Sequence, residues 1–167
     1  MRVSNGGIVN NVLVIGDLHE PFSLDKYLEF CVSKYEQFDC TEVVFIGDII
    51  DNHYASYHET NADGMGGADE LEYAIQRIAR WYKAFPKATI IIGNHDRMVM
   101  RKAQTSSIPS CEHYVGQNFR VFGMQVGTGI KFSEYSFAYA KAGKKPAIGC
   151  GVVLRNGKLP INLLMEL

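Results

Sequence analysis

Three short apolar runs alternate with helical patterns in the first hundred residues. The runs cover residues 12–15, 43–46 and 89–92, and a glycine follows each of them at once. They are rich in β-branched residues and do not alternate with polar positions, which is typical of strands buried on both faces of a sheet. The order strand, helix, strand, helix, strand predicts a parallel sheet with right-handed crossovers.

Between these runs, apolar residues recur at helical spacing. One stripe extends over residues 24–38, and Ser23 is placed to cap that helix. The second stripe has Asp69 and Glu70 near its start, and we expect its apolar members to face the core: Leu71, Ile75, Ile78, Tyr82 and Phe85. In the last third, residues 119–126 suit a strand, and residues 148–154 and 159–165 suit a hairpin with Asn156-Gly157 in a type I′ turn.

Each of the three apolar runs ends in a polar tip. The tips are Gly16-Asp17-Leu18-His19, Gly47 to His53, and Gly93-Asn94-His95-Asp96. Functional groups of an open parallel sheet gather beyond the carboxyl ends of its strands. We therefore expect the three tips to deliver carboxylate, imidazole and amide groups to one crevice.

These side chains suit two divalent cations. Asp17 and His19 lie two apart and can hold one ion, Asp48 can bridge two ions, and Asn94 offers a neutral oxygen to the second. Mixed imidazole and carboxylate ligands favour manganese, iron or zinc over calcium. Two ions about 3.5–4 Å apart would clamp a phosphate and activate a water for in-line attack on phosphorus.

Charge is balanced overall but not along the chain. The 167 residues carry 17 Lys and Arg against 18 Asp and Glu, a net charge of −1, which argues against a protein held to nucleic acid mainly by a basic surface. Residues 35–76 hold ten acids and no Lys or Arg, whereas residues 77–102 hold seven basic residues and one acid. A solvated acidic face and a cation site both account for the first stretch.

Composition and cysteine spacing indicate one soluble domain over residues 1–167. Hydrophobic residues make up 47% of the chain, enough for a core, and no run approaches membrane-spanning length. The four cysteines are far apart, with no C-x-x-C pair, and no signal peptide begins the chain. We expect a cytoplasmic protein, in a bacterium or a phage-infected cell, that has no membrane partner.

The three tips together resemble the leading signature of the calcineurin-like metallophosphoesterases: Gly-Asp-x-His, Gly-Asp-x-x-Asp and Gly-Asn-His-Asp. The sequences of residues 47–53 and of the segment Phe122 to Gly127 resemble those of the phage and prophage branch of this family. The resemblance implies an α/β fold, a two-sheet sandwich flanked by helices, whose second, mostly antiparallel sheet begins near residue 119. It implies hydrolysis of a phosphomonoester or phosphodiester. It also implies these roles: metal ligands Asp17, His19, Asp48 and Asn94, a catalytic His95 near the leaving oxygen, and Asp96 holding the ring of His95.

The chain departs from the family where a Gly-His-x-His loop belongs. Its five histidines are His19, His53, His58, His95 and His113, and none stands in that pattern. A natural shortening, an internal deletion and an edited gene all fit. The departure favours an alternative function, a catalytically incomplete domain that binds a metal weakly or binds a partner, and it predicts at most one tightly held ion.

Several other residues are candidates with ordinary alternatives. We expect His53 and His58 to line the substrate mouth, Arg97 to hold a phosphate oxygen, and Asp51 to orient ligands rather than ligate. His113 is a candidate substitute ligand, although an exposed loop histidine fits it too. The resemblance implies a phosphate ester as the substrate. Nucleic acid is a further candidate, suggested only by six basic residues within 131–158, which solvated hairpin faces also explain.

Overall fold

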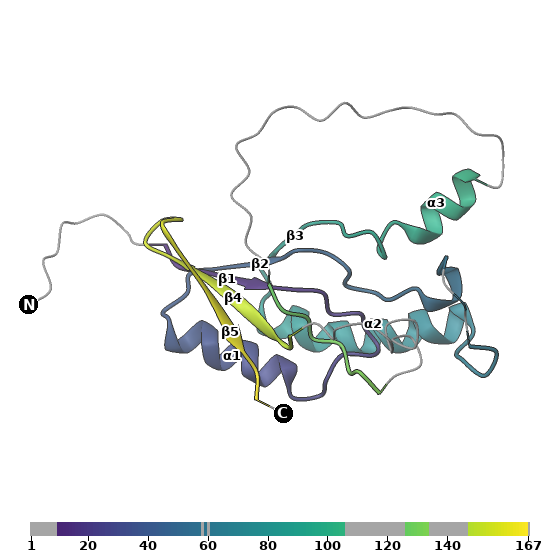
Figure 1. Ribbon diagram of the computed structural model, residues 1–167, viewed down its shortest axis with the longest axis horizontal. Coiled ribbons are helices and arrows are strands. Elements are labelled where there is room, and N and C mark those ends of the chain that lie inside the picture. The colour runs from purple at the N-terminus through teal and green to yellow at the C-terminus, as the bar shows by residue number, and fades with distance from the viewer. Residues whose placement is uncertain (1–9, 58, 60, 106–125, 134–146, 167) are drawn as a thin grey trace, which may run out of the picture.

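The computed structural model describes residues 10–57, 59, 61–105, 126–133 and 147–166, and its five strands form one mixed sheet. The strands lie in the order β3-β2-β1-β4-β5 (Figure 1). β1 pairs in parallel with β2, and β2 with β3, as the alternating pattern predicts. The strand bounds are β1 Val12–Ile15, β2 Glu42–Phe45, β3 Thr89–Ile90, β4 Gly149–Leu154 and β5 Leu159–Leu164. The helix bounds are α1 Tyr27–Gln37, α2 Gly67–Ala84, α3 Met98–Thr105 and the 3-10 turn η1 His53–Ala55.

The α/β class is confirmed, but the C-terminal hairpin lies elsewhere than expected. Among the described residues, β4 does not start a second sheet but pairs antiparallel with β1 and extends the same sheet, with Leu13 opposite Val152. β5 then forms the edge. Polar backbone groups on the open side of β1 need partners, and β4 supplies them. The strand predicted at residues 119–126 lies outside the described residues except for Val126.

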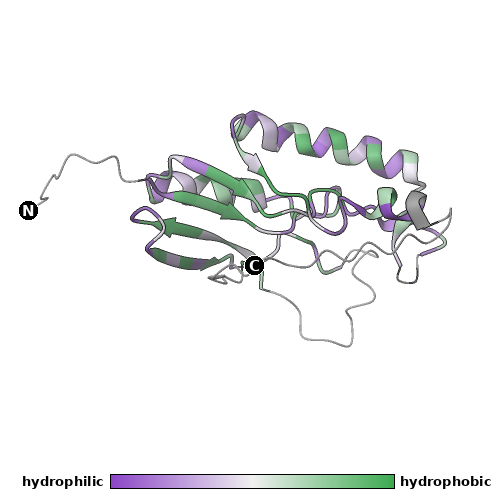
Figure 2. Cartoon of the chain, turned by 90° about the horizontal axis from the view of Figure 1, so that it is seen from above, coloured by the Kyte–Doolittle hydropathy of each residue, from purple (hydrophilic) through white to green (hydrophobic). Residues whose placement is uncertain are grey.

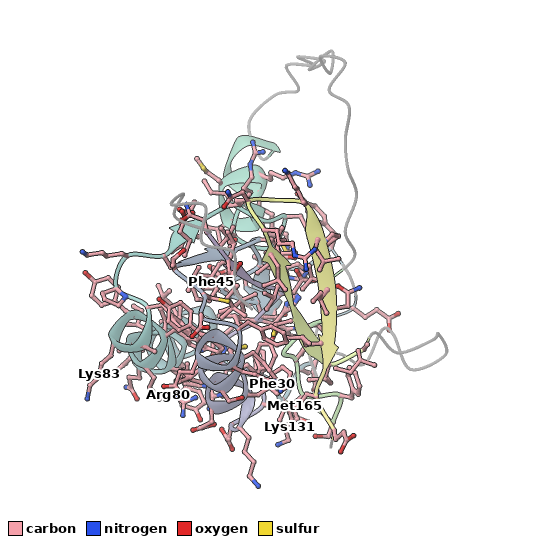
Figure 3. The ribbon with its side chains drawn as sticks, turned by 90° about the vertical axis from the view of Figure 1, so that its left-hand side faces the viewer. Phe30, Phe45, Arg80, Lys83, Lys131 and Met165 are labelled. Carbon is pink, nitrogen blue, oxygen red and sulfur yellow. The ribbon has the colours of Figure 1, made fainter. Side chains whose placement is uncertain are left out.

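The core lies between this sheet and the layer formed by α1 and α2 (Figures 1 and 3). The Tyr27 ring of α1 lies 5.7 Å from the Trp81 ring of α2, and Phe45 of β2 lies 5.7 Å from Trp81. The Tyr27 hydroxyl donates a 2.6 Å hydrogen bond to the Gly149 carbonyl, which ties α1 to β4. None of the helices in the described ranges has both the length and the apolar composition needed to span a membrane.

The buried face of α2 is not the predicted apolar stripe. Its buried residues are Glu70, Ala74, Arg77 and Trp81, while Leu71, Ile75 and Tyr82 are 44%, 58% and 71% exposed. Figure 2 shows hydrophobic and hydrophilic residues alternating along this helix. The prediction failed because a buried polar network, described below, decides which side of the helix meets the sheet. Phe85, just beyond the helix, is buried as expected.

Three local predictions also need correction. No side chain caps α1, and the Ser23 hydroxyl instead donates to the Glu20 carboxylate at 2.7 Å. β3 has only two residues, and the isoleucines at 90–92 are exposed rather than buried. The hairpin turn has four residues, 155–158, because Leu154 pairs with Leu159; positive φ angles occur at Arg155, Asn156 and Gly157.

Candidate metal centre

The three polar tips meet at one edge of the sheet, as predicted. The backbone N–H groups of Leu18 and His19 both donate to the Asp48 carbonyl, at 3.1 and 2.8 Å, which joins the first tip to the second. The backbone N–H of His95 donates to Asp48 Oδ1 at 2.7 Å, which joins the third. Asp48 is therefore the central residue of the three tips.

A group of ligand atoms suited to a cation lies at this junction. One atom each from Asp17, His19 and Asp48 lie within 4.8 Å of one another. His19 and Asp48 are 8% exposed, so their polar groups have little access to water. Carboxylate oxygens this close repel each other unless a proton or a cation lies between them. The residues present therefore fit a divalent metal ion.

The Asn94 side chain lies against the Asp48 carboxylate, next to this donor set. Its side-chain oxygen faces Asp48 Oδ2 at 3.3 Å, so two acceptors face each other. Turning the amide over would let its nitrogen donate to Asp48 instead. The turned amide also accepts from the His95 N–H at 3.3 Å, so it satisfies both groups without a cation. The ligand role of Asn94 therefore stays a prediction.

Asp51 holds the imidazoles beside this group. Its Oδ1 accepts a 2.7 Å hydrogen bond from His19 Nδ1, which leaves Nε2 of His19 to bind a metal. Its backbone carbonyl accepts a 2.6 Å hydrogen bond from Nδ1 of His95. His19, Asp51 and His95 form a second group close enough to hold an ion. Because Nδ1 of each histidine is already hydrogen bonded to Asp51, the group with Asp17 and Asp48 is the better candidate.

The electrostatics of the donor set make protons compete with a metal ion for Asp17 and His19. Burial raises the pKa of the Asp17 carboxyl; His19 opposes the rise and the nearby Asp48 carboxylate adds to it. For His19, burial acts to lower the pKa, but the hydrogen bond to Asp51 and the surrounding carboxylates outweigh it, so the pKa is raised. Both residues hold protons more tightly than usual, so a metal must displace those protons to bind.

His95 and Asp96 are brought to the site, but their predicted contact is replaced. The Asp96 carboxylate accepts from the backbone N–H groups of Ile49, Ile50 and Gly93, at 2.9, 3.2 and 2.9 Å. The His95 ring is held by the Asp51 carbonyl and packs edge-on against the His19 ring, with centroids 4.6 Å apart. Asp96 therefore fixes the second tip against the third, and Asp51 orients His95.

The backbone at the site is strained where the tips turn. His19, Asp48 and Asn52 have φ angles of 51°, 49° and 52°, a left-handed conformation that costs free energy for residues with a side chain. At Gly93 a Cβ would collide with the Asp48 carboxylate, so only glycine permits this close approach. Strain that the surrounding contacts hold in place is common at functional sites.

A buried polar network behind the first tip was not predicted. Glu20, next to His19, is fully buried and accepts from Arg77 Nε, from the Ser23 hydroxyl and from Trp81 Nε1 at 2.8 Å. The Arg77 guanidinium also contacts Asp25 at 2.9 Å. This network anchors the first tip to α2. An arginine and a glutamate 57 positions apart leave no periodic signal that would reveal it in the sequence.

A second buried carboxylate supports the loop after Asp51. Glu70 at the start of α2 is 1% exposed and accepts from the backbone N–H of His53 at 2.9 Å. Burial raises its pKa. In the sequence, Asp69 and Glu70 stand out only as acids near the start of a helix, so nothing there predicts this loop-supporting contact.

Of the residues predicted to meet the substrate, only His53 is placed differently, while the roles of Arg97 and His58 stay predictions. His53 is 6% exposed, with Nδ1 3.8 Å from Asp51 Oδ2, so it lies beneath the site rather than at an open mouth. Burial lowers its pKa, and Asp51 opposes that effect. Arg97 is exposed, directly after the third tip. His58 and His113 lie outside the described residues.

Carboxylate and imidazole groups gathered at the strand ends of a mixed sheet are typical of a metal-binding α/β protein. The model of the calcineurin-like phosphoesterase family matches residues 11–158, so the chain belongs to that family. Membership of this family indicates a reaction class, the metal-dependent hydrolysis of phosphate esters. Comparisons with curated proteins and with solved structures found no match.

Proposed function

We propose that this protein hydrolyses phosphomonoesters or phosphodiesters with the help of two divalent metal ions. The observation that carries the proposal is the convergence of Asp17, His19 and Asp48, with Asn94 facing Asp48. The family match over residues 11–158 supports the reaction class.

Each residue at the edge of the sheet has a distinct part. Asp17 and His19 would hold one ion, Asn94 the other, and Asp48 both. When bound, such ions polarise the phosphoryl oxygens and lower the pKa of a water. Asp51 keeps Nδ1 of His19 and of His95 occupied, so each ring presents Nε2. Through Nε2, His95 would give a proton to the leaving oxygen, as a general acid does.

The proposal extends to the identity of the metal, the branch of the family and the cellular compartment. Mixed imidazole, carboxylate and amide ligands favour manganese, iron or zinc. The spelling of residues 47–53 supports a place in the phage branch. Cys31, Cys40 and Cys150 are buried free thiols, which suits a reducing compartment such as the cytoplasm.

One observation favours a second candidate, a catalytically incomplete domain. No histidine of the chain stands in a Gly-His-x-His pattern, so the described residues supply few ligands to a second ion. Water would fill the remaining positions, and the ion held by Asp48 and the neutral Asn94 would be lost first. In this case the chain retains at most one ion after dialysis.

Metal analysis combined with turnover separates the two candidates. The purified chain is dialysed, its metal content is measured, and hydrolysis of p-nitrophenyl phosphate and of bis(p-nitrophenyl) phosphate is followed with added manganese, iron or zinc. The proposal expects metal-dependent turnover that Asp48→Ala abolishes together with metal binding. Asp63→Ala, an exposed acid of the same acidic stretch, is the matched control. Metal binding without turnover under all three metals would favour the incomplete domain.

A further inference from the structure

Helix α3 carries a row of positive charges directly after the metal-binding tip. Arg97 precedes the helix, and Arg101 and Lys102 follow one turn later, with no acidic residue from 97 to 105. The Arg101 N–H donates to the Arg97 carbonyl at 2.9 Å, so these two arginines lie one turn apart on the helix. Like charges at this spacing destabilise a helix, and a phosphate between or beside them would offset that cost.

The aromatic residue Tyr57 holds two of these cations side by side. The Arg101 guanidinium lies 5.5 Å from the centre of the Tyr57 ring, and the Lys102 ammonium lies 5.6 Å from it. Lys102 Nζ also donates to the Ser56 carbonyl at 3.1 Å. A cation over an aromatic face is attracted by the ring quadrupole, so the positions of both charges are defined before any ligand arrives.

The metal-binding tips fix this cluster in place. The Met98 N–H at the start of α3 donates to the His95 carbonyl at 3.0 Å. The Asn52 side chain, at the end of the second tip, donates to the same carbonyl at 3.0 Å. η1 and then Tyr57 follow Asn52 within five residues. The two strand tips therefore hold the cations and the ring that positions them beside the metal centre.

We propose that Arg101, Lys102 and Tyr57 form a subsite for two further phosphates of the substrate, one at each cation, and that the substrate is single-stranded nucleic acid. This proposal rests on the proposed function, because the first phosphate is the one cleaved at the metal centre. Tyr54 and Tyr57 are 43% and 58% exposed, and aromatic rings interleaved with cations are the usual means of binding single strands. A phosphopeptide needs the cations but not the exposed rings, so the rings favour nucleic acid.

The net charge of −1 does not oppose this substrate, because the subsite is local. Two cations bind two negative charges of a strand, not a long duplex backbone. For single strands each neutralised phosphate contributes about −0.7 to the slope of log affinity against log salt. The subsite therefore predicts a slope of about −1.4, or about a sevenfold loss of affinity between 50 and 200 mM salt.

The test compares two substrates on three proteins. The substrates are a fluorescent deoxythymidine decamer and bis(p-nitrophenyl) phosphate, which has no second phosphate. The proteins are the wild type, the double variant R101A/K102A and the control K83A. Lys83 lies on α2, on the side of the molecule away from α3 (Figure 3). Thermal melting of each protein checks that the fold is retained.

We expect the ratio of decamer to aryl diester kcat/KM to fall in R101A/K102A by about fivefold for each lost contact, the upper range for an exposed ion pair. K83A should keep the wild-type ratio. An unchanged ratio in a folded double variant would overturn the proposal. A phosphoserine peptide serves as a third substrate. If R101A/K102A lowers kcat/KM for this peptide but not for the decamer, the cluster binds phosphoproteins and the proposal is overturned as well.

A binding measurement keeps this proposal separate from the proposed function. Fluorescence anisotropy of the decamer is measured with EDTA present, so that no turnover occurs. If the wild type cleaves neither substrate yet binds the decamer with a slope near −1.4 that R101A/K102A removes, the hydrolytic function fails and the subsite stands. If the slope of log affinity against log salt is the same in all three proteins, the subsite is refuted, whether or not the wild type cleaves either substrate.

Discussion

Replacing Asp51 by asparagine isolates the part played by one carboxylate in the metal centre. Asp51 is 3% exposed, and its Oδ1 lies 2.7 Å from Nδ1 of His19. Asparagine keeps the shape but removes the charge that fixes the His19 ring. Losing such a partner of a metal ligand typically costs 10–100-fold in metal affinity, about 1.4–2.8 kcal/mol. The His95 ring should stay in place, because its partner is the Asp51 backbone carbonyl.

The loss of metal affinity in Asp51→Asn should depend on pH because of the pKa of His19. In the wild type, the Asp51 hydrogen bond and the nearby carboxylates raise that pKa against the effect of burial, so a proton competes with the metal as the pH falls. Asp51→Asn removes the main cause of the rise and leaves burial, which lowers the pKa. The difference in affinity between wild type and variant should therefore be largest at pH 8 and narrow toward pH 6.

Calorimetric titration with manganese at pH 8, 7 and 6 measures both effects. Asp63→Asn removes the same charge from an exposed position of the acidic stretch and is the matched control. The stoichiometry should be unchanged in both variants. Equal affinities for Asp51→Asn and Asp63→Asn would refute the orienting role of Asp51. If Asp51→Asn binds fewer ions per chain than the wild type, Asp51 is a direct ligand instead. If the difference in metal affinity between wild type and Asp51→Asn does not narrow from pH 8 to pH 6, the pKa argument is refuted.

Three further changes test other parts of the structure. His95→Ala should leave metal content nearly unchanged and lower turnover by about 10²–10⁴-fold, as for a lost general acid, and equal metal loss would show that His95 is a ligand. Arg77→Ala leaves the buried Glu20 carboxylate without its charged partner and should cost about 3–5 kcal/mol in urea unfolding, whereas Arg80→Ala, at an exposed position of the same helix, should cost little. Gly93→Ala places a Cβ against the Asp48 carboxylate; we expect a loss of about 1–3 kcal/mol in stability and weaker manganese binding, and unchanged affinity would contradict the close approach.

The sequence by itself determined the metal-binding edge of the sheet. The runs ending at Ile15 and Ile46 and the tips after them specify parallel strands, and the carboxyl ends of parallel strands lie at one edge. Asp17, His19 and Asp48 therefore lie close together because each of them follows directly after one of these strands. The orienting role expected for Asp51 followed from the same spacing, and the structure places its carboxylate against His19.

The tertiary structure decided what depends on contacts between distant residues. The partner of the His95 ring is a backbone carbonyl of the second tip, and the Asp96 carboxylate binds backbone N–H groups of that tip; residue types alone do not specify either contact. The hairpin joined the first sheet because β1 had an unpaired side. The orientation of α2 was decided by the ion pair between Arg77 and the buried Glu20. A buried carboxylate requires a charged partner, and that requirement outweighed the apolar stripe of the helix, which remains largely exposed.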